Sequence, residues 1–326
     1  MKAIVQDRYG EPQAVLRLRD IGKPTPEEGE VLVRVTAASL HRGDCFVVRG
    51  RPFLVRMMTG LFRPKPGIPG FDFAGRVEAL GANVTDLAVG DEVFGSCEGS
   101  YGACAEYVTA HESKLVRKSA GIPFEEAAAV PTSALAALHG LRDAGRLQAG
   151  QKVLVNGASG GVGTFAVQIG VALGAQVTGV CSTQNLERVR GIGAGKVIDY
   201  TRDDFTRGDR RYDVLLDNVE NRALAECRRV LTPNGTLVLN SGSGASGLRL
   251  LIRLVAPMLL APFVRHRLVR YVSTPKKEDL RFLARLLEDG KLRPVIDRTY
   301  SLDETAEALE YLRAGHARGK VVIRVG

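Results

Sequence analysis

The chain has 326 residues, enough for about two domains, and its 45% hydrophobic and 25% charged content excludes a largely disordered protein. Lysine and arginine (45) outnumber aspartate and glutamate (36), but the excess is spread along the chain and aromatic residues make up only 6%, so no nucleic-acid partner is expected. The longest uncharged apolar run, residues 254–264, is too short for a transmembrane segment.

The five cysteines are scattered and form no C-x-x-C pair. This usage is typical of a reducing compartment rather than of a disulfide framework. The first residues run straight into strand-like sequence without a signal-peptide pattern. We therefore expect a cytoplasmic protein.

The first third of the chain predicts a β-rich barrel or sandwich. Short strand-like runs alternate with glycine and proline turns at residues 31–35, 76–80, 91–94 and 105–108.

From residue 123 the pattern changes, because Pro123 and two glutamates are typical of the start of a helix. Beyond residue 150, apolar strands alternate with helices. The expected strands are 152–156, 176–180, 196–198, 214–216 and 236–239, and the expected helices are 164–173 and 185–192. This alternation predicts an α/β fold with a doubly wound parallel sheet. Helices over 279–289 and 305–312 and a strand over 320–325 follow.

Residues 245–272 interrupt this alternation with an arginine-containing apolar segment. One interpretation is an amphipathic membrane-surface segment. The interpretation we favour is a lid or subunit-contact pair of helices whose arginines face solvent.

A glycine-rich turn follows the strand at 152–156 and precedes a helix. Ala158, Gly160 and Gly163 have the G/A-x-G-x-x-G spacing, in which small residues allow a tight turn, a close approach of a pyrophosphate and close packing of the helix. The alternative is a plain tight turn. Because strand, turn and helix occur in the required order, we predict a dinucleotide site formed by Ala158, Ser159, Gly160, Gly161, Val162 and Gly163.

The end of the second strand of this unit indicates which dinucleotide binds. An NAD site usually has an acid about 20 residues beyond the turn, and residues 178–184 contain none. The hydroxyls of Ser182 and Thr183 and the guanidinium of Arg188 suit a 2′-phosphate, although Arg188 alone could be a solvated helix residue. We therefore predict NADPH as the cofactor. Asn218, at the carboxyl end of the fourth strand, is a candidate for the ribose.

With these residues in place, the chain resembles the medium-chain dehydrogenase/reductase superfamily, most closely its zinc-free, quinone-oxidoreductase-like branch. The resemblance covers nearly the whole chain and rests on the segments 26–33, 69–75, 89–95, 125–128, 197–200 and 318–322 together with the glycine turn. It implies a GroES-like catalytic domain made of residues 1–120 and 273–326 around a Rossmann cofactor domain of residues 121–272. It also implies a homodimer.

The resemblance adds further cofactor residues. It places Tyr200 beside the adenine ribose, although a strand-end core tyrosine is the alternative. Their positions in the chain make five other residues candidates for the ribose or nicotinamide end: Asn218 and Val219 after the fourth expected strand, Asn240 and Ser241 after the fifth, and Thr132 in the helix near the domain junction. Glu220 and Asn221 stand where the family usually has two glycines, so backbone contacts to the cofactor are uncertain there.

The chain departs from zinc-dependent members of the superfamily. His41 replaces a ligand cysteine, Phe71 replaces a ligand histidine, and only Cys97 and Cys104 fall in the stretch that usually carries a four-cysteine lobe. We therefore predict no metal site. A quinone or conjugated enone spreads the charge left by hydride transfer over its own π-system, so a site without metal suits such acceptors.

His41 is the candidate catalytic residue, because related zinc-free enzymes commonly place an asparagine there. An imidazole titrating near neutrality could donate a hydrogen bond or a proton to the substrate oxygen, whereas the alternative is a structural histidine. We interpret Asp44 and Asp72 as structural acids. The apolar, arginine-flanked segment 51–66 is either a pocket wall for a hydrophobic acceptor or a packing loop.

The sequence thus predicts a zinc-independent NADPH-dependent reductase of quinones or α,β-unsaturated carbonyls. Two alternatives stay open. One is a zinc-dependent alcohol dehydrogenase, and the other is an NADPH-sensing or RNA-binding protein with little catalytic activity.

Overall fold

The computed structural model describes residues 1–65, 67–97, 102–240, 255–315 and 317–326. The chain folds into two units, which we describe separately. The first contains Met1–Ser133 and Pro275–Gly326, and the second contains Ala134–Thr274.

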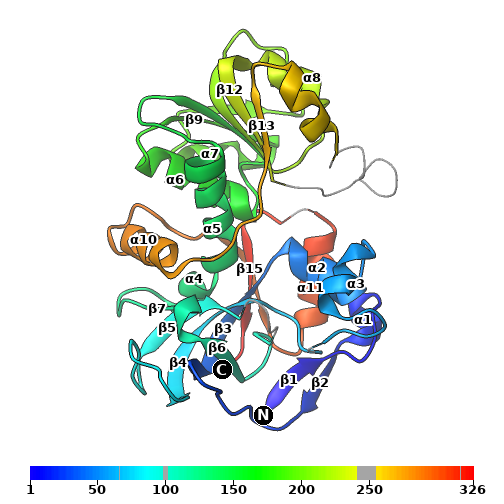
Figure 1. Cartoon of the computed structure of the whole chain (residues 1–326), viewed down its shortest axis with the longest axis vertical. Coiled ribbons are helices and arrows are strands. Elements are labelled where there is room, and N and C mark those ends of the chain that lie inside the picture. The colour runs from blue at the N-terminus through cyan, green and yellow to red at the C-terminus, as the bar shows by residue number, and fades with distance from the viewer. Residues whose placement is uncertain (66, 98–101, 241–254, 316) are drawn as a thin grey trace. The chain divides into compact units, whose positions relative to one another are not determined.

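The second unit is built on a six-stranded parallel sheet with the strand order β10-β9-β8-β11-β12-β13 (Figure 1). This is the order of a Rossmann fold, in which the chain reverses direction across the sheet between β8 and β11. The strands are β8 (Lys152–Asn156), β9 (Gln176–Cys181), β10 (Lys196–Asp199), β11 (Tyr212–Asp217), β12 (Leu231–Leu239) and β13 (Arg267–Arg270). The predicted α/β fold with a doubly wound sheet is confirmed.

Helices connect most of these strands. They are α6 (Gly161–Ala172), the 3-10 turn η3 (Thr183–Asn185), α7 (Leu186–Gly191), α8 (Leu224–Arg229), a helix over 255–260, the 3-10 turn η4 (Ala261–Phe263) and the π-helix η2 (His139–Ala144). Helix α5 (Pro131–Leu138) begins in the first unit. Val153, Leu154 and Val155 of β8 are fully buried, as are Phe165, Ala166 and Val167 of α6. Such continuous burial explains why these segments read as apolar runs rather than as alternating patterns.

The expectation of a helix pair over residues 245–272 is wrong for its last part. Residues 267–270 form β13, which extends the sheet beside β12, and the interpretation of solvent-facing arginines fails for two of them. Arg267 donates to the carbonyl of Ala144, and Arg270 forms an ion pair with Glu220. Sheet pairing therefore overrides the helix-like composition of residues 267–270. Residues 245–254 of the same segment lie outside the described part of the chain.

The first unit is a GroES-like barrel made from both ends of the chain. Its seven-stranded sheet has the order β14-β15-β3-β4-β5-β7, with β6 paired to β3, and a separate two-stranded sheet joins β1 and β2. The C-terminal strand β15 pairs antiparallel with β3, so that Val321 lies opposite Leu40. The strands are β1 (Lys2–Val5), β2 (Arg17–Asp20), β3 (Glu30–Leu40), β4 (Asp72–Leu80), β5 (Glu92–Ser96), β6 (Tyr107–His111), β7 (Leu115–Arg117), β14 (Ile296–Ser301) and β15 (Lys320–Arg324).

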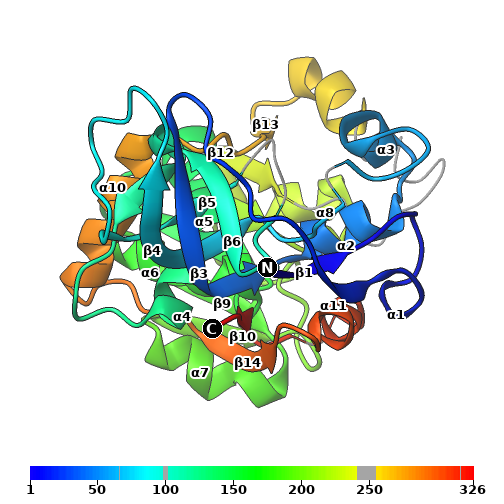
Figure 2. The same ribbon diagram turned by 90° about the horizontal axis from the view of Figure 1, so that it is seen from below.

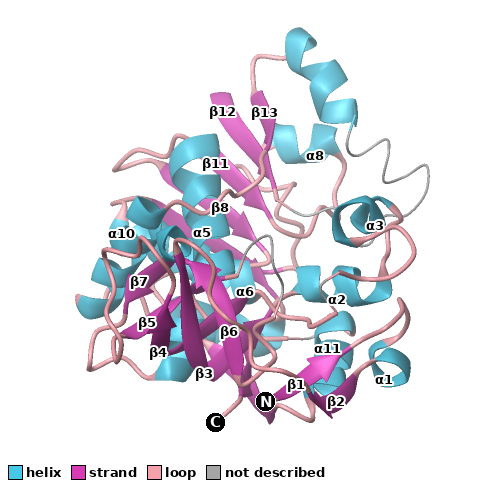
Figure 3. Ribbon diagram, turned by 60° about the horizontal axis from the view of Figure 1, so that its bottom comes forward, coloured by secondary structure: helices cyan, strands magenta, loops and turns pink. Residues whose placement is uncertain are grey.

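One buried cluster joins the two chain ends in this unit, with Val33, Val35 and Phe73 from the N-terminal part and Val321 and Ile323 from the C-terminal part. Helices α1, α2 and α11 pack beside one another, and α3 contacts α2 (Figures 2 and 3). The helical segments of the unit are α1 (Pro12–Val15), α2 (Arg42–Arg49), α3 (Leu54–Thr59), η1 (Glu112–Lys114), α4 (Phe124–Ala128), α10 (Lys277–Glu288) and α11 (Thr305–Arg313). Across the described part of the chain, no helix has the length and apolar character needed to cross a bilayer.

Candidate functional site: a nucleotide turn and a buried charged cluster

The predicted glycine turn joins β8 to the start of α6 and is shaped by two glycines. Gly157 has a φ of +79°, a left-handed conformation that favours glycine. A Cβ on Gly163 would lie 2.0 Å from the carbonyl oxygen of Gly157, so only a residue without a side chain lets the helix approach the turn this closely. The sequence therefore builds a tight strand-turn-helix connection, as the spacing predicts.

The start of α6 has the features of a phosphate-binding helix end. Gly160 is its N-cap, and no side chain in the described residues caps it. The amide groups of the first helical turn have no partner within the helix itself, so they are available to an anion at the positive end of the helix dipole. Ser159, Gly160, Gly161 and Val162 are partly exposed there, whereas Ala158 and Gly163 are buried. The turn thus fits the diphosphate of a nicotinamide cofactor.

The residues predicted at the 2′-phosphate lie beyond the carboxyl end of β9. Ser182 accepts a hydrogen bond from Asn185, and Arg188 lies exposed on α7. Tyr200, predicted beside the adenine ribose, is exposed directly after β10. Thr183 donates to the carboxylate of Asp199 over 2.5 Å. Asp199, an acid that was not predicted in this site, therefore lies against the hydroxyl of Thr183.

Asp199 carries a negative charge, because the hydrogen bond from Thr183 lowers the pKa of its carboxyl group, and further bonds from Thr201 act in the same direction. The register of the sheet explains its position, since Asp199 pairs with Cys181 where parallel β9 and β10 both end. Looking for an acid only at the end of β9 misses Asp199. Comparing the ends of the neighbouring parallel strands β9 and β10 finds it.

The ends of β11 and β12 bring two predicted residues together. Asn240 donates to the side-chain oxygen of Asn218 over 2.7 Å, and Asn218 donates to the carbonyl of Asn156 over 3.1 Å. Val219 follows Asn218 and is partly exposed. Ser241 lies outside the described residues.

Glu220 stands where the resemblance implies a glycine, and its backbone conformation is one that glycine adopts easily. Its φ is +55°, in the left-handed region that side chains other than glycine seldom adopt. Its carboxylate receives two hydrogen bonds from Arg270, of 2.9 and 2.7 Å. This bidentate pair, which sequence reasoning missed, ties the loop after β11 to β13.

In the first unit, His41 is fixed at the start of α2. Its Nδ1 accepts a hydrogen bond from the amide of Gly43 over 3.0 Å, and its own amide donates to Asp44 over 2.8 Å. The imidazole stacks on Phe71 with ring centroids 5.0 Å apart. Both capping bonds and the stacking hold the ring in one orientation.

This environment determines the charge and the tautomer of His41. Burial, assisted by the charge of Lys320, lowers its pKa to about 3, so the expectation that it titrates near neutrality is wrong. Because Nδ1 accepts from Gly43, the proton of the neutral ring is on Nε2. Nε2 is buried and has no hydrogen-bond partner among the described residues. His41 therefore presents an unpaired N–H donor, which costs about 1–3 kcal/mol unless a ligand oxygen accepts from it.

A set of buried charges, here called the buried charged cluster, lies close to His41 and consists of Asp44, Asp72 and Lys320. All three side chains are almost completely buried. The Nζ atom of Lys320 lies 3.8 Å from Asp72 and donates to Ser133 over 3.0 Å. Burial, together with the charge of Asp72, raises the pKa of Asp44 to about 7. Two carboxyl groups thus share one buried cation.

The buried charged cluster also fixes Thr132, which was predicted near the nicotinamide. Its hydroxyl donates to Asp72 over 2.6 Å, and its amide donates to the same carboxylate over 3.2 Å. Asp72, 60 residues away in sequence, therefore caps the first turn of α5.

Within the described residues, no group of three or more histidine, cysteine, aspartate or glutamate side chains is arranged to hold a metal ion. Phe71, which by the resemblance replaces a ligand histidine of zinc-dependent enzymes, is stacked on His41.

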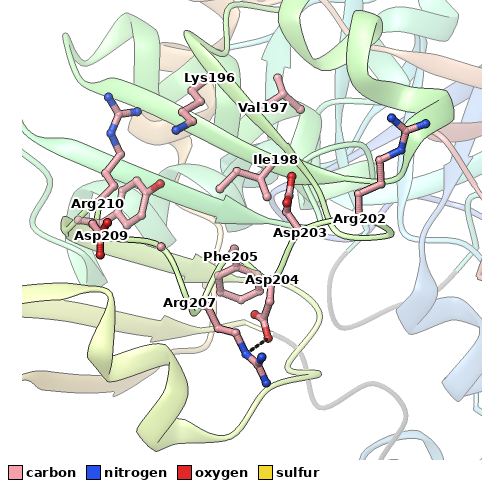
Figure 4. A pocket seen from close by; sticks show the side chains of 12 residues that line it. Lys196, Val197, Ile198, Arg202, Asp203, Asp204, Phe205, Arg207, Asp209 and Arg210 are labelled. Atoms are coloured by element: carbon pink, nitrogen blue, oxygen red, sulfur yellow. Dashed lines mark ion pairs between the residues drawn. The ribbon is translucent and has the colours of Figure 1, made fainter.

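A cavity of about 580 Å³ lies beside β10 in the second unit (Figure 4). It is bordered by charges of both signs, such as Asp204 and Arg207, which form an ion pair. Its lining includes no residue of the glycine turn and none of the residues that end β11 and β12. We therefore do not include it in the cofactor site.

Comparison with known proteins agrees with this architecture. Residues 27–123 match the alcohol dehydrogenase GroES-like domain, and residues 192–323 match the zinc-binding dehydrogenase family.

Relatives align over nearly the whole chain. A 2-methylene-furan-3-one reductase of Solanum lycopersicum is 32% identical over 99% of this chain and 79% of its own length. An NADPH-dependent alkenal/one oxidoreductase of Arabidopsis thaliana shows the same identity and the same coverage. The structure of a quinone oxidoreductase from Coxiella burnetii superimposes with a TM-score of 0.86 at 30% identity, over 100% of this chain and 99% of that one. With its Rossmann unit, its GroES-like barrel and these relatives, the chain belongs to the medium-chain dehydrogenase/reductase superfamily, in the quinone-oxidoreductase-like branch.

Proposed function

We propose that this protein is a zinc-independent reductase that uses NADPH to reduce quinones or α,β-unsaturated carbonyl compounds. The observation that carries the proposal is the unpaired Nε2–H of a neutral His41, at the position where zinc-dependent relatives have a metal ligand. The names of the tomato and Arabidopsis relatives support the same class of acceptor. On the resemblance we also propose a homodimer, and on the scattered cysteines we propose a cytoplasmic location.

For the cofactor, we propose that the turn from Ala158 to Gly163 binds the diphosphate, while Ser182, Thr183 and Arg188 bind the 2′-phosphate and Tyr200 lies beside the adenine ribose. Asn218, Val219, Asn240, Ser241 and Thr132 are proposed for the ribose and nicotinamide end. The charge of Asp199 opposes a 2′-phosphate at Thr183, so the cationic Arg188 has to offset it. When bound, the nicotinamide supplies the hydride.

For the acceptor, we propose that Nε2–H of His41 donates a hydrogen bond to the oxygen on which negative charge develops. A neutral imidazole acts there as a fixed dipole and not as a proton source, because its pKa of about 3 leaves no dissociable excess proton at neutral pH. Conjugated acceptors fit this arrangement, since their π-system carries part of the charge.

The test is turnover by the purified protein with NADPH or NADH and three acceptors: a quinone, a conjugated enone and the matching saturated ketone. We expect oxidation of NADPH with the first two acceptors only, and no loss of rate after treatment with a zinc chelator. Turnover of the saturated ketone alone, or loss of activity on chelation, would refute the proposal.

Two variants test the role of His41. His41→Phe removes the donor while keeping an aromatic ring to stack on Phe71, and kcat should fall by about 10²–10³. His41→Asn keeps an N–H donor and should retain most of the activity. Equal losses in both variants would show that His41 has only a structural role.

A further inference from the structure

The segment from residue 51 to residue 65, here called the basic apolar loop, exposes large apolar side chains in the first unit. Phe53 is 62% exposed, Met57 70%, Leu61 46% and Phe62 88%. Exposed apolar groups gathered in so short a segment indicate an interaction surface, whereas single exposed apolar residues need no explanation. None of these four side chains lines the cavity beside β10 or a second cavity bordered by β7 and α10.

The loop is held firmly to the unit rather than projecting as a loose end. The hydroxyl of Tyr9 donates to the carbonyl of Gly60 over 2.6 Å and lies 2.8 Å from the hydroxyl of Thr59. The guanidinium of Arg56 lies 4.7 Å from the centre of the Tyr9 ring and donates to the carbonyl of Gly50. These contacts fix α3, which carries Met57, and Gly60, which directly precedes Leu61 and Phe62.

The charge of the loop has a single sign. No aspartate or glutamate occurs between residues 45 and 71, whereas this stretch contains four arginines and one lysine. Arg51, Arg63 and Lys65 are exposed and form no ion pair within the described part of the chain. Three uncompensated cations therefore lie in the same short segment as the four exposed apolar side chains.

We propose that the basic apolar loop docks this protein on an anionic lipid surface. Apolar side chains that enter the boundary between headgroups and acyl chains, accompanied by cations that meet anionic headgroups, make up the usual chemistry of peripheral membrane attachment. The exposed charges of the loop are all positive, so an anionic surface complements them. The proposal does not depend on the reaction proposed above.

The experiment measures binding of the full-length protein to vesicles of phosphatidylcholine, with and without phosphatidylglycerol, by flotation at low and high salt. We expect binding only to the anionic vesicles and a decrease at high salt. The double variant Met57→Glu/Phe62→Glu should bind at least about tenfold more weakly, because both anchors are lost. The double variant Arg51→Glu/Arg63→Glu should also weaken binding, by about tenfold or more.

Val89→Glu is the matched control, because Val89 is an exposed apolar residue of the same unit that lies next to acids such as Asp91. It should bind like the wild type. The absence of tryptophan from the chain allows a second measurement. The emission of Phe62→Trp should shift to the blue on anionic vesicles and be quenched by brominated lipid, whereas that of Val89→Trp should not.

Failure of the wild type to bind vesicles would overturn the proposal, as would equal binding by the double variants and the control. Two other outcomes would also overturn it. One is a variant that leaves vesicle binding intact but dissociates an oligomer, which would show that a second copy covers the loop. The other is binding to single-stranded RNA in preference to anionic vesicles.

Discussion

The glycine turn and the buried charged cluster form two chemically different regions, and they are assembled in different ways. The turn consists of consecutive residues from Gly157 to Gly163, and its shape follows from local backbone geometry. The cluster draws Asp44, Asp72 and Lys320 from α2, β4 and the last strand of the chain. One region is encoded by spacing along the sequence, whereas the other exists only once β3, β4 and β15 have paired.

The difference determines how each region responds to change. The glycine turn is disrupted when a substitution adds a side-chain atom at a position where the backbone is too closely packed to hold it. A buried cluster is broken by removing one charge, because the remaining charges are then left without compensation in a medium of low polarity. The four predictions below test this contrast, from the largest expected effect to the smallest.

Lys320→Met should lower the free energy of unfolding by about 3–5 kcal/mol, because Asp72 loses its buried cation. Urea denaturation measures this effect. Lys291→Met is the control, since Lys291 pairs with Asp289 at the surface and should change stability by less than about 1 kcal/mol. If both variants lost the same stability, the cluster would not be the electrostatic unit described here.

Gly163→Ala should lower stability by about 1–3 kcal/mol and weaken NADPH binding, because its Cβ would lie 2.0 Å from the Gly157 oxygen and 2.8 Å from the Cα of Ala158. Thermal unfolding and a fluorescence titration measure the two effects. Gly191→Ala is the control: nothing in the described residues lies within 4 Å of its Cβ, and alanine favours the helix. A tolerated Gly163→Ala would contradict the tight packing of the turn.

Asp199→Asn should shift the preference between cofactors by up to about tenfold towards NADPH, because it removes a negative charge from beside Thr183. Parallel titrations with NADPH and NADH measure the ratio of the two dissociation constants. Asp203→Asn removes the same charge from an exposed neighbour in the same loop and should change the ratio less. Equal ratios in the two variants would place the 2′-phosphate elsewhere.

Asp44→Asn should gain stability relative to the wild type as the pH rises. The folded-state pKa of Asp44 is raised to about 7 from a usual value near 4, so its contribution is fully present below pH 4 and is lost as the pH rises through 7. His41 is present in both proteins, so its contribution largely cancels in the comparison.

Urea denaturation of Asp44→Asn and the wild type between pH 4 and 8 measures this trend. Asp86→Asn should show almost no trend over this range, because the hydrogen bond from Lys277 lowers the pKa of Asp86 below its usual value near 4 and its titration therefore lies at lower pH. A difference between Asp44→Asn and the wild type that does not change with pH would contradict the raised pKa of Asp44.

The sequence predicted those parts that depend on local patterns. The strand at 152–156, the turn and its helix follow from apolar periodicity and glycine spacing; the strand has the expected bounds, and the helix begins at Gly161 instead of residue 164. The last strand was also predicted, but nothing near residue 320 in sequence indicated that its lysine is buried against Asp72.

The features that sequence reasoning missed all depend on tertiary pairing. Asp199 lies near Thr183 because two parallel strands end together, and Arg270 meets Glu220 because residues 267–270 add a strand to the sheet. The neutral state of His41 results from burial by residues distant in the chain, among them Phe71 and Lys320. A single sequence does not reveal these contacts, because each one joins residues far apart in the chain, and no sequence motif links the two positions.

The pairing of β15 with β3 also bears on how the protein is made. Residues 134–274 are synthesised as one continuous block, so the Rossmann unit has all its strands while the ribosome is still translating. The barrel must wait for the final residues, and until Lys320 emerges, Asp72 has no counter-charge and β3 lacks one neighbour. Nascent chains that stall before the last strand should therefore expose an unfinished barrel to chaperones and proteases beside a Rossmann unit that has already folded.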